Sequence, residues 1–444
     1  MKPVTSRECA LRVLQSVKNA AAWSDAALKA QLERDQLSGA EAALATRLVY
    51  GVMQNRMQLD YWIGAYCTQK PDHLQNPLLD ILRLGVYQIV FLDRIPDSAA
   101  VNESVNLTRQ FGRAQAAGLV NAVLRKVVQN KQNLPRPSDK DAVQYLSITF
   151  SHPKWLVKRL MTILGAEETE AFLRANNGAV PTTVQYNPLR TAPATLVSGL
   201  KEEGVTAAPH AWVPGCFTLT GTGNLASLKT FQNGEFLVQD AAAHLVTAAA
   251  QPLPGMRVID VCAAPGGKSF AAAFAMQNRG EIISCDLHEN KLKRIRDGAQ
   301  RLGISCIHTA AADGRVPNPD WVDNADLVIV DAPCSGLGII RKKPDIRYKN
   351  PNELFALPVI QTAILDNAAR YVKAGGTLVY STCTVLPEEN QQITDAFLAE
   401  HSEFSRESFV LPDGREIADG QITFWPHRDD VDGFYICRMR RRGD

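Results

Sequence analysis

Two cysteines in this 444-residue chain stand where a protein thiol could do covalent chemistry. Cys334 follows the apolar run DLVIVD (326–331), and Cys383 follows GTLVYS (376–381). Both runs are predicted strands of a mostly parallel sheet, in which the first, fourth and fifth strands are commonly neighbours about 4.8 Å apart. We therefore expect the two thiols and Asp331, which ends the first run, to meet at one edge of that sheet.

A turn between a strand and a helix forms the third part of the predicted site. The apolar run RVIDV (257–261) predicts a buried strand, and KSFAAAFAMQN (268–278) predicts a helix. Between them, the small residues of CAAPGG (262–267) let a ligand approach the backbone, and the first N–H groups of the helix point into the turn. Doubly wound folds bind small molecules at such junctions, although an ordinary tight turn is the alternative.

The spacing of the glycines distinguishes three kinds of ligand. A phosphate-binding P-loop needs a glycine where this chain has Cys262, and a dinucleotide-binding fingerprint needs separated glycines, whereas Gly266 and Gly267 are adjacent. An adenosine without a phosphate chain remains. S-adenosylmethionine fits, because its sulfonium and amino-acid groups need carboxylates and close contact with the backbone. We therefore expect S-adenosylmethionine as the cofactor.

Acidic residues follow the next two predicted strands. Asp286 ends EIISCD (281–286), 19 residues after Gly267, where such folds hold the hydroxyl groups of a ribose. Asp313 follows the third predicted strand, ISCIHT (304–309), and could contact an adenine amino group. Taken alone, Asp313 is better explained as a turn residue.

Two thiols beside a methyl donor indicate methylation at carbon 5 of a pyrimidine. That carbon is a poor nucleophile, but a thiolate that adds to carbon 6 makes it able to take a methyl group. Asp331 could hydrogen-bond N3 of a cytosine, while the second thiol acts as a base or assists release. A helix predicted to start at Pro387 favours a thiolate at Cys383, and Glu388 and Glu389 oppose this. Spacing does not rank the two thiols, and either cysteine taken singly could be a small core residue.

The elements that must position these residues indicate three domains, at 1–135, 136–235 and 236–444. The first reads as an all-α bundle of about six or seven helices, with one helix starting at Pro77 and another after Pro96. The second reads as a small α+β domain. The third alternates strands and helices regularly, which is typical of a Rossmann-like α/β domain.

Composition is that of a soluble cytoplasmic protein, and we expect a monomer. No apolar run approaches membrane-spanning length, and no charged and apolar leader opens the sequence. Nine cysteines without C-x-x-C pairs or clustered histidines argue against a metal site and against disulfides. Residues 1–150 carry 18 basic and 13 acidic side chains, an excess that a solvated helical surface explains more readily than nucleic-acid binding.

Two further groups of side chains could contact RNA. The basic run RKKPDIRYK (341–349) follows Cys334 closely and could hold phosphates, although surface charge is the default interpretation. Trp155, Tyr186 and Phe231 could stack on bases, although such aromatic residues more often belong to a core.

The motifs DVCAAPGGKS, DAPCSG, STCTVLPEEN and DGFY resemble those of the RNA cytosine-5 methyltransferases. IPDSAAVNESVNL and GLVNAVLRKV resemble the RNA-binding antitermination factor NusB, so nearly the whole chain resembles the Fmu/RsmB type that modifies 16S ribosomal RNA. The resemblance implies that Cys383 is the nucleophile and that Cys334 assists product release. It also implies that the cofactor is held by Cys262, Ala263, Ala264, Pro265, Gly266, Gly267, Lys268, Asp286, Asp313 and Asp331.

The same resemblance implies 16S ribosomal RNA as the partner, with the cytosine at position 967 in standard 16S numbering as the target. Tyr435 stands where the family usually has phenylalanine, a small departure. The alternative from another class is an RNA-binding ribosome-assembly factor whose methyltransferase-like domain only binds. Retention of both thiols and the three acids argues against it, and an oxidoreductase is a third possibility.

Overall fold

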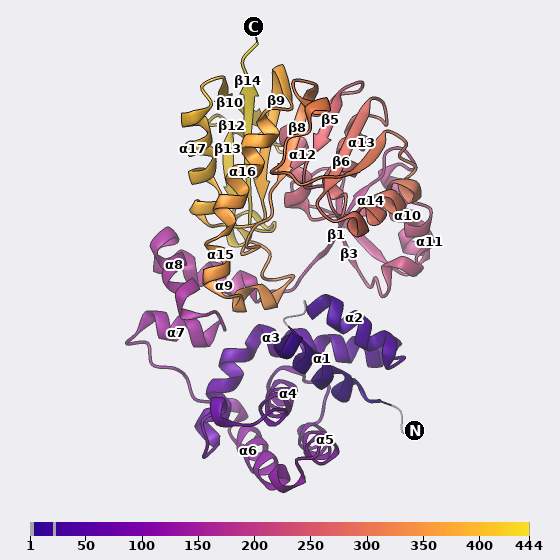
Figure 1. The fold of residues 1–444 in the computed structure, drawn as a ribbon. Helices are drawn as coiled ribbons and strands as arrows, with labels where there is room; N and C mark the ends of the chain where they lie inside the picture. The colour runs from indigo at the N-terminus through magenta and orange to yellow at the C-terminus, as the bar shows by residue number, and fades with distance from the viewer. Residues whose placement is uncertain (1–3, 21–23, 444) are drawn as a thin grey trace. The chain divides into compact units, whose positions relative to one another are not determined.

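The computed structural model describes residues 4–20 and 24–443 (Figure 1). The chain forms two compact units, which are residues 1–178 with 340–349, and residues 179–339 with 350–444. We refer to these as the first and the second unit. The domain boundaries predicted after residues 135 and 235 stay predictions.

The first unit is helical throughout its described residues. Six α-helices lie within residues 4–129, in agreement with the predicted bundle. The helices of this unit are α1 (Ser6–Ala20), α2 (Ser24–Arg34), α3 (Gly39–Tyr66), η1 (Pro71–His73), α4 (Leu78–Phe91), α5 (Asp97–Gln110), η2 (Ala114–Ala116), α6 (Ala117–Gln129), η3 (Lys131–Asn133), α7 (Ala142–Thr149), α8 (Lys154–Leu164), α9 (Ala166–Asn176) and η6 (Pro344–Tyr348).

Helix α4 is the most deeply buried helix of this bundle. Pro77 precedes it, as predicted, and Ile81 and Leu84 are among the many residues that it buries. Helix α6 is amphipathic instead, since Val123 and Val127 are buried in the same core while its charged side chains are exposed. Burial of these apolar side chains is the main favourable contribution to folding of the bundle.

Part of the basic run at 341–349 belongs to the core of the first unit, whereas its lysines Lys342, Lys343 and Lys349 are partly exposed. Arg347 is fully buried, and its Nη1 donates hydrogen bonds to the carbonyl oxygens of Gln54, Phe150 and Ser151 at 3.0, 3.3 and 3.1 Å. A guanidinium that already binds buried carbonyl groups cannot reach an RNA phosphate. Arg347 is therefore excluded as a phosphate ligand, whereas phosphate binding by the RKK part of the run, residues 341–343, stays a prediction.

The second unit begins with a small antiparallel sheet. Its strands are ordered β2-β3-β1-β4, in agreement with the predicted α+β domain. The elements of this part are β1 (Thr182–Tyr186), α10 (Pro193–Glu202), β2 (Thr206–Pro209), β3 (Cys216–Thr220), η4 (Leu225–Ser227), α11 (Lys229–Gln232) and β4 (Phe236–Val238). Phe231 packs edge-on against Phe236, and the Arg301 guanidinium lies 3.9 Å above its ring, so packing explains this aromatic residue.

The rest of the second unit surrounds an eight-stranded sheet with the path β10-β14-β9-β8-β5-β6-β7, and β13 pairs with β14. Figure 1 shows helices on both faces of this sheet. The elements are α12 (Ala241–Ala250), β5 (Arg257–Asp260), α13 (Gly267–Ala275), β6 (Glu281–Asp286), α14 (Glu289–Leu302), β7 (Ile307–Ala311), η5 (Pro319–Trp321), β8 (Ala325–Asp331), α15 (Pro351–Leu354), α16 (Leu357–Ala369), β9 (Val372–Thr382), η7 (Pro387–Glu389), α17 (Gln391–Glu400), β10 (Phe404–Arg406), β11 (Phe409–Val410), β12 (Glu416–Ile417), β13 (Gln421–Phe424), α18 (Pro426–Asp429) and β14 (Phe434–Arg441).

The order of the parallel strands confirms the arrangement expected from the sequence. β5 pairs with β8, and β8 pairs with β9, with Asp331 opposite Ser381. Alternate residues of these strands enter two cores, because successive side chains point to opposite faces of a sheet. Val258 packs with α12, α13 and α14 on one face, and Ile259 packs with α16 and α17 on the other.

Two elements differ from their predicted bounds. Strand β7 starts at Ile307 rather than at residue 304, because Ile304 and Cys306 pack into the core beside α14 before the ladder begins. The helix expected at Pro387 is a single 3₁₀ turn, η7, and the α-helix α17 starts only at Gln391. A favourable dipole at Cys383 from a long helix at Pro387 is therefore not available.

Candidate active site

The two thiols predicted to meet at the sheet edge lie next to each other. Sγ of Cys334 is 3.3 Å from Sγ of Cys383, although 49 residues separate them in the chain. β8 and β9 end side by side, and each cysteine lies in the loop that leaves its strand. Both side chains are partly exposed. An incoming ring could therefore contact one sulfur while the second lies within hydrogen-bonding distance of the first.

Asp331 links this pair of thiols to the loop after β5. Its Oδ2 accepts a hydrogen bond from Nζ of Lys268 at 2.6 Å, and its Oδ1 accepts one from Oγ of Ser381 at 3.0 Å. Burial is the largest single effect and lowers the pKa of Lys268, but the charge and hydrogen bond of Asp331, together with the charges of Asp260 and Cys383, outweigh it and the net pKa is raised. Lys268 is thus a cation held beside Asp331, which the sequence did not pair with it.

The turn at 262–268 brings backbone close to this edge. Gly266 has φ of 109°, a conformation that L side chains rarely adopt, and a Cβ at this position would lie 2.5 Å from the Phe270 ring. The N–H of Ala263 binds the carbonyl oxygen of Cys285 at 2.7 Å, and α13 starts at Gly267. The free N–H groups of the first turn of α13 therefore face the loop, as the strand–turn–helix prediction requires.

Asp260 is a buried acid at the end of β5 that sequence reasoning left without a role. Its Oδ2 accepts a hydrogen bond from Ser269 at 2.7 Å, and Ser284 donates to the Ser269 hydroxyl at 2.8 Å. Oδ1 is buried without a partner among the described residues. Burial raises the pKa of Asp260 to about 7. A lone carboxylate ending an otherwise apolar strand, RVIDV, was the available signal.

The two acids predicted to hold an adenosine end neighbouring strands. Asp286 is the last residue of β6, and its Oδ1 accepts the N–H of His288 at 2.9 Å. Asp313 follows β7 and forms two side-chain hydrogen bonds with Arg315, which lower its pKa to about 2. Asp286 thus keeps an oxygen for a ligand, whereas Asp313 is paired with its own neighbour.

Side chains in this region fit an adenosine-containing methyl donor. The turn at 262–268 would adjoin its amino-acid end, because its small residues and the positive φ of Gly266 leave the backbone open to a ligand. Asp260, whose Oδ1 has no partner among the described residues, lies two residues before the turn and accepts a hydrogen bond from Ser269 just after it. Asp286, Asp313 and Asp331 lie at the ends of β6, β7 and β8, and β5 and these three strands form the run β8-β5-β6-β7. Ligands of doubly wound sheets bind at this carboxyl edge.

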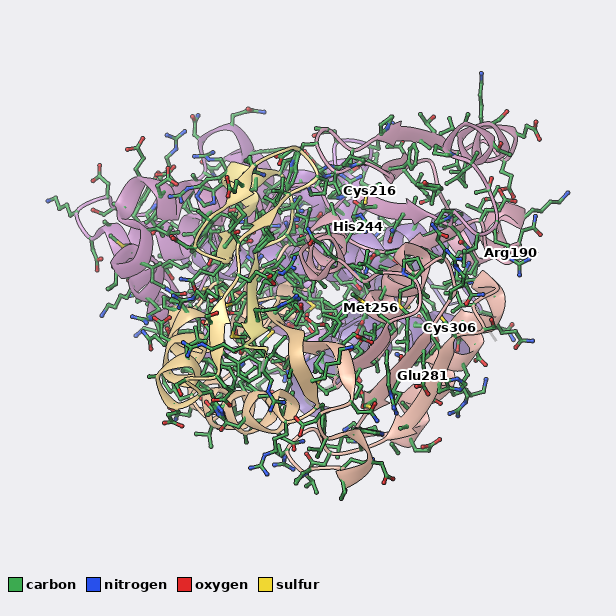
Figure 2. All side chains as sticks on the ribbon, turned by 90° about the horizontal axis from the view of Figure 1, so that it is seen from above. Arg190, Cys216, His244, Met256, Glu281 and Cys306 are labelled. Carbon is green, nitrogen blue, oxygen red and sulfur yellow. The ribbon has the colours of Figure 1, made fainter. Side chains whose placement is uncertain are left out.

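All nine cysteines are free thiols, and of the seven besides Cys334 and Cys383, Cys262 belongs to the turn at 262–268. Figure 2 shows Cys216 and Cys306 well apart within the second unit. Across residues 4–20 and 24–443, no three His, Cys, Asp or Glu side chains are placed to hold a metal ion. Within the same ranges, no helix is both long and apolar enough to cross a bilayer.

The fold and this edge together define a methyltransferase domain of the Rossmann-like class, joined to a NusB-like helical domain and a ferredoxin-like domain. Three family models match: NusB at residues 4–129, the ferredoxin-like domain of the RsmF/B methyltransferases at 152–226, and 16S rRNA methyltransferase RsmB/F at 247–440. The chain belongs to the RsmB/F family of 16S rRNA methyltransferases. The predicted fold class and family are confirmed.

Relatives match over nearly the whole chain. It is 37% identical to the probable ribosomal RNA small subunit methyltransferase B of Bacillus subtilis, over 100% of both chains. It is 31% identical to the ribosomal RNA small subunit methyltransferase B of Escherichia coli O157:H7, over 92% of each. The crystal structure of PH0851 has 26% identity, a TM-score of 0.82 and 99% coverage of both chains. A methyltransferase homologue from Pyrococcus horikoshii has 25% identity and a TM-score of 0.59, over 68% of this chain and 99% of its own.

Proposed function

We propose that this protein methylates carbon 5 of a cytosine in 16S ribosomal RNA, using S-adenosylmethionine and a covalent bond from Cys383 to carbon 6. The observation that carries the proposal is the pair of thiols 3.3 Å apart beside Asp331 and the glycine turn. Two sulfurs at one edge suit a reaction with an addition step and an elimination step. The relatives named as small subunit methyltransferases support ribosomal RNA as the substrate.

In the first step, the Cys383 sulfur forms a bond to carbon 6 and the ring electrons move toward N3. A proton delivered at N3 favours this addition, and the Lys268–Asp331 pair is the adjacent proton source. S-adenosylmethionine supplies the electrophilic methyl group when it is bound. Residues 262–268, with Asp286, Asp313 and Asp331, would hold it.

In the second step, carbon 5 carries the methyl group it has taken as well as its original proton, and an elimination restores the double bond between carbons 5 and 6. The proton on carbon 5 leaves, its electron pair forms the double bond, and the bond from carbon 6 to the Cys383 sulfur breaks. Cys334 is the group next to that sulfur that can accept the proton. Several effects raise the pKa of Cys334 well above its ordinary value. The largest is the hydrogen bond to Cys383, and burial is the next. This bond is lost when Cys383 is bound to carbon 6, which lowers the pKa of Cys334, so a larger fraction of Cys334 is the thiolate that can accept the proton at this stage.

Two cysteine variants test the proposal. Cys383→Ala should abolish methyl transfer from radiolabelled donor while cofactor affinity stays within about twofold, because the thiol forms the bond but does not hold the cofactor. Cys334→Ala should accumulate a protein–RNA adduct that survives denaturing electrophoresis. Cys67→Ala, which removes a partly exposed thiol of the first unit, is the control. Full turnover by Cys383→Ala would assign the nucleophile elsewhere.

The target and the setting of the reaction are part of the same proposal. We expect the substrate cytosine at position 967 of 16S ribosomal RNA, in the cytoplasm, and bisulfite mapping of ribosomal RNA from cells without the protein tests this. A base in an RNA loop is already partly unstacked, so moving it into the site costs less than from a duplex. A protein that binds this RNA but transfers no methyl group would be the assembly factor considered as the alternative.

A further inference from the structure

One buried carboxylate contacts both of the loops that carry the thiols. Glu389 of η7 is 1% exposed. Its Oε2 accepts hydrogen bonds from the backbone N–H of Ser335 at 2.8 Å and from Nε2 of Gln361 at 2.9 Å. Its Oε1 accepts one from Oγ1 of Thr384 at 3.3 Å. Ser335 follows Cys334 in the sequence, and Thr384 follows Cys383. The Glu389 carboxylate therefore binds the residue directly after each cysteine.

The two loops are also joined directly, which closes a ring of hydrogen bonds. The hydroxyls of Ser335 and Thr384 are 2.7 Å apart, and both residues are fully buried. The N–H of Gly338 donates to the carbonyl oxygen of Cys383 at 3.0 Å. Hydrogen bonds shielded from water hold geometry more firmly than exposed ones. The separation of the two sulfurs is therefore set by this ring and not only by the strands.

Residues around Glu389 fix it in turn. The Tyr380 hydroxyl donates to the carbonyl oxygen of Glu389 at 2.8 Å. The next residue, Asn390, accepts from the Thr382 hydroxyl at 2.6 Å and donates to the carbonyl oxygen of Thr384 at 3.1 Å. The 3₁₀ turn at 387–389 and Asn390 after it thus hold the segment that contains Cys383, through residues before and after that cysteine.

The charges around Cys334 favour its neutral thiol in the free protein. Its titratable neighbours are Cys383, Glu389, Asp331 and Tyr380, and Lys268 lies on the other side of Asp331. After the hydrogen bond to Cys383 and burial, the negative charges of Cys383, Glu389 and Asp331 each raise the pKa of Cys334 further. Removing the charge of Glu389 should therefore make Cys334 more acidic.

We propose that Glu389 is a positioning residue for methyl transfer. It holds the loops that carry Cys334 and Cys383 at a fixed separation, and it keeps Cys334 protonated until Cys383 has reacted. The inference rests on the proposed function. It assigns no contact between Glu389 and substrate, because the carboxylate acts through Ser335 and Thr384.

Glu389→Gln is the first test, with Glu388→Gln as the matched control. In Glu389→Gln, kcat should fall by about 10- to 100-fold with the KM for RNA within about twofold, because misplacing the reacting groups slows a step more than it weakens binding. Alkylation of Cys334 by iodoacetamide near pH 8.5, followed by mass spectrometry, should be several-fold faster than in the wild type. Cys437, which is fully buried, should stay unmodified and reports that the variant is folded. Glu388→Gln should leave both readouts within about twofold.

A second pair of variants separates position from charge. Thr384→Val removes one hydroxyl of the ring but leaves the Glu389 charge, so kcat should fall about tenfold while Cys334 alkylation stays at the wild-type rate. Thr384→Ser keeps the hydroxyl and should retain most of kcat. Comparison of these two Thr384 variants also tests the positioning role of the ring if Glu389→Gln does not fold.

Three results would overturn the inference. They are a wild-type kcat in Glu389→Gln, an unchanged rate of Cys334 alkylation in that variant, and equal kcat values for Thr384→Val and Thr384→Ser. Each of them can be obtained with a wild-type protein that methylates cytosine normally. Failure of the wild type to methylate carbon 5 would instead overturn the proposed function.

Discussion

At the scale of single residues, the proposed chemistry depends on partly or fully buried polar groups at the ends of strands. Lys268 and Asp331 form a close ion pair, and Ser381 binds the second oxygen of the same carboxylate. Tyr435, the departure from the family motif, is buried with its hydroxyl bonded to Thr394 and Gln421 at 2.9 and 2.6 Å. The extra oxygen is therefore satisfied in place, and the substitution leaves the site unaffected.

Asp260 predicts a pH dependence of stability. Its pKa is about 7 in the folded protein, above its ordinary value of 3.8, so between about pH 4 and pH 7 the unfolded chain ionises this group and the folded protein does not. The free energy of unfolding should fall over that range, on the order of 2–4 kcal/mol from this residue. Asp260→Asn should remove this loss. Urea unfolding at pH 5 and pH 8 should therefore show that the free energy of unfolding of the variant, relative to wild type, is higher at pH 8 than at pH 5.

The control for this prediction is Asp297→Asn, which changes an aspartate whose side chain is 60% exposed. It should follow the wild-type pH dependence. A difference between wild type and Asp260→Asn that is the same at both pH values would contradict the prediction.

At the scale of elements, the site depends on neighbouring strand ends and on short turns. β8 and β9 pair regularly from Leu327 to Asp331, and this places the two loops that follow them together. The 3₁₀ turn η7 supplies Glu389 between them. The segment 340–349 leaves the loop that carries Cys334 and packs into the first unit through Arg347 and Tyr348, whose hydroxyl donates to the carbonyl oxygen of Met53 at 2.9 Å.

Arg347→Met should destabilise the first unit strongly. The substitution leaves the buried carbonyl groups of Gln54, Phe150 and Ser151 without this donor, and the loss should be about 3 kcal/mol or more in the free energy of unfolding. Lys343→Met is the control, because its ion pair with Asp25 spans 3.8 Å between exposed side chains and contributes little. Denaturant unfolding followed by circular dichroism measures both, and equal stabilities would refute the structural role of Arg347.

At the scale of the whole molecule, the chain passes between its two units three times, at 178–179, 339–340 and 349–350. The large apolar side chains that are exposed among the described residues come from separate elements, and only Phe355 and Val359 are within four residues of each other. Within any one element, therefore, the described residues expose no row of large apolar side chains of the kind that lines the face of a stable dimer.

We therefore predict a monomer of 48.6 kDa in solution. Light scattering after size-exclusion chromatography should give this mass across a range of protein concentrations. A stable species of twice that mass would contradict the prediction and would direct attention to Phe355 and Val359.

The sequence by itself determined the parts that depend on local pattern. Short apolar runs located β5, β6, β8 and β9, and the motifs located Cys334, Cys383 and the glycine turn. The resemblance in those motifs indicated the family. These features are readable because strand periodicity and turn chemistry act over a few residues.

Only the tertiary structure decided which distant groups meet. Spacing in the sequence does not reveal that Lys268 binds Asp331 or that Glu389 binds Ser335. It also does not reveal that Arg347 is buried in a unit formed by residues far earlier in the chain. The physical reason is that a charged side chain is expected to be exposed when only the sequence is known. Long-range packing can nevertheless bury it where hydrogen-bond or charged partners replace the water it loses.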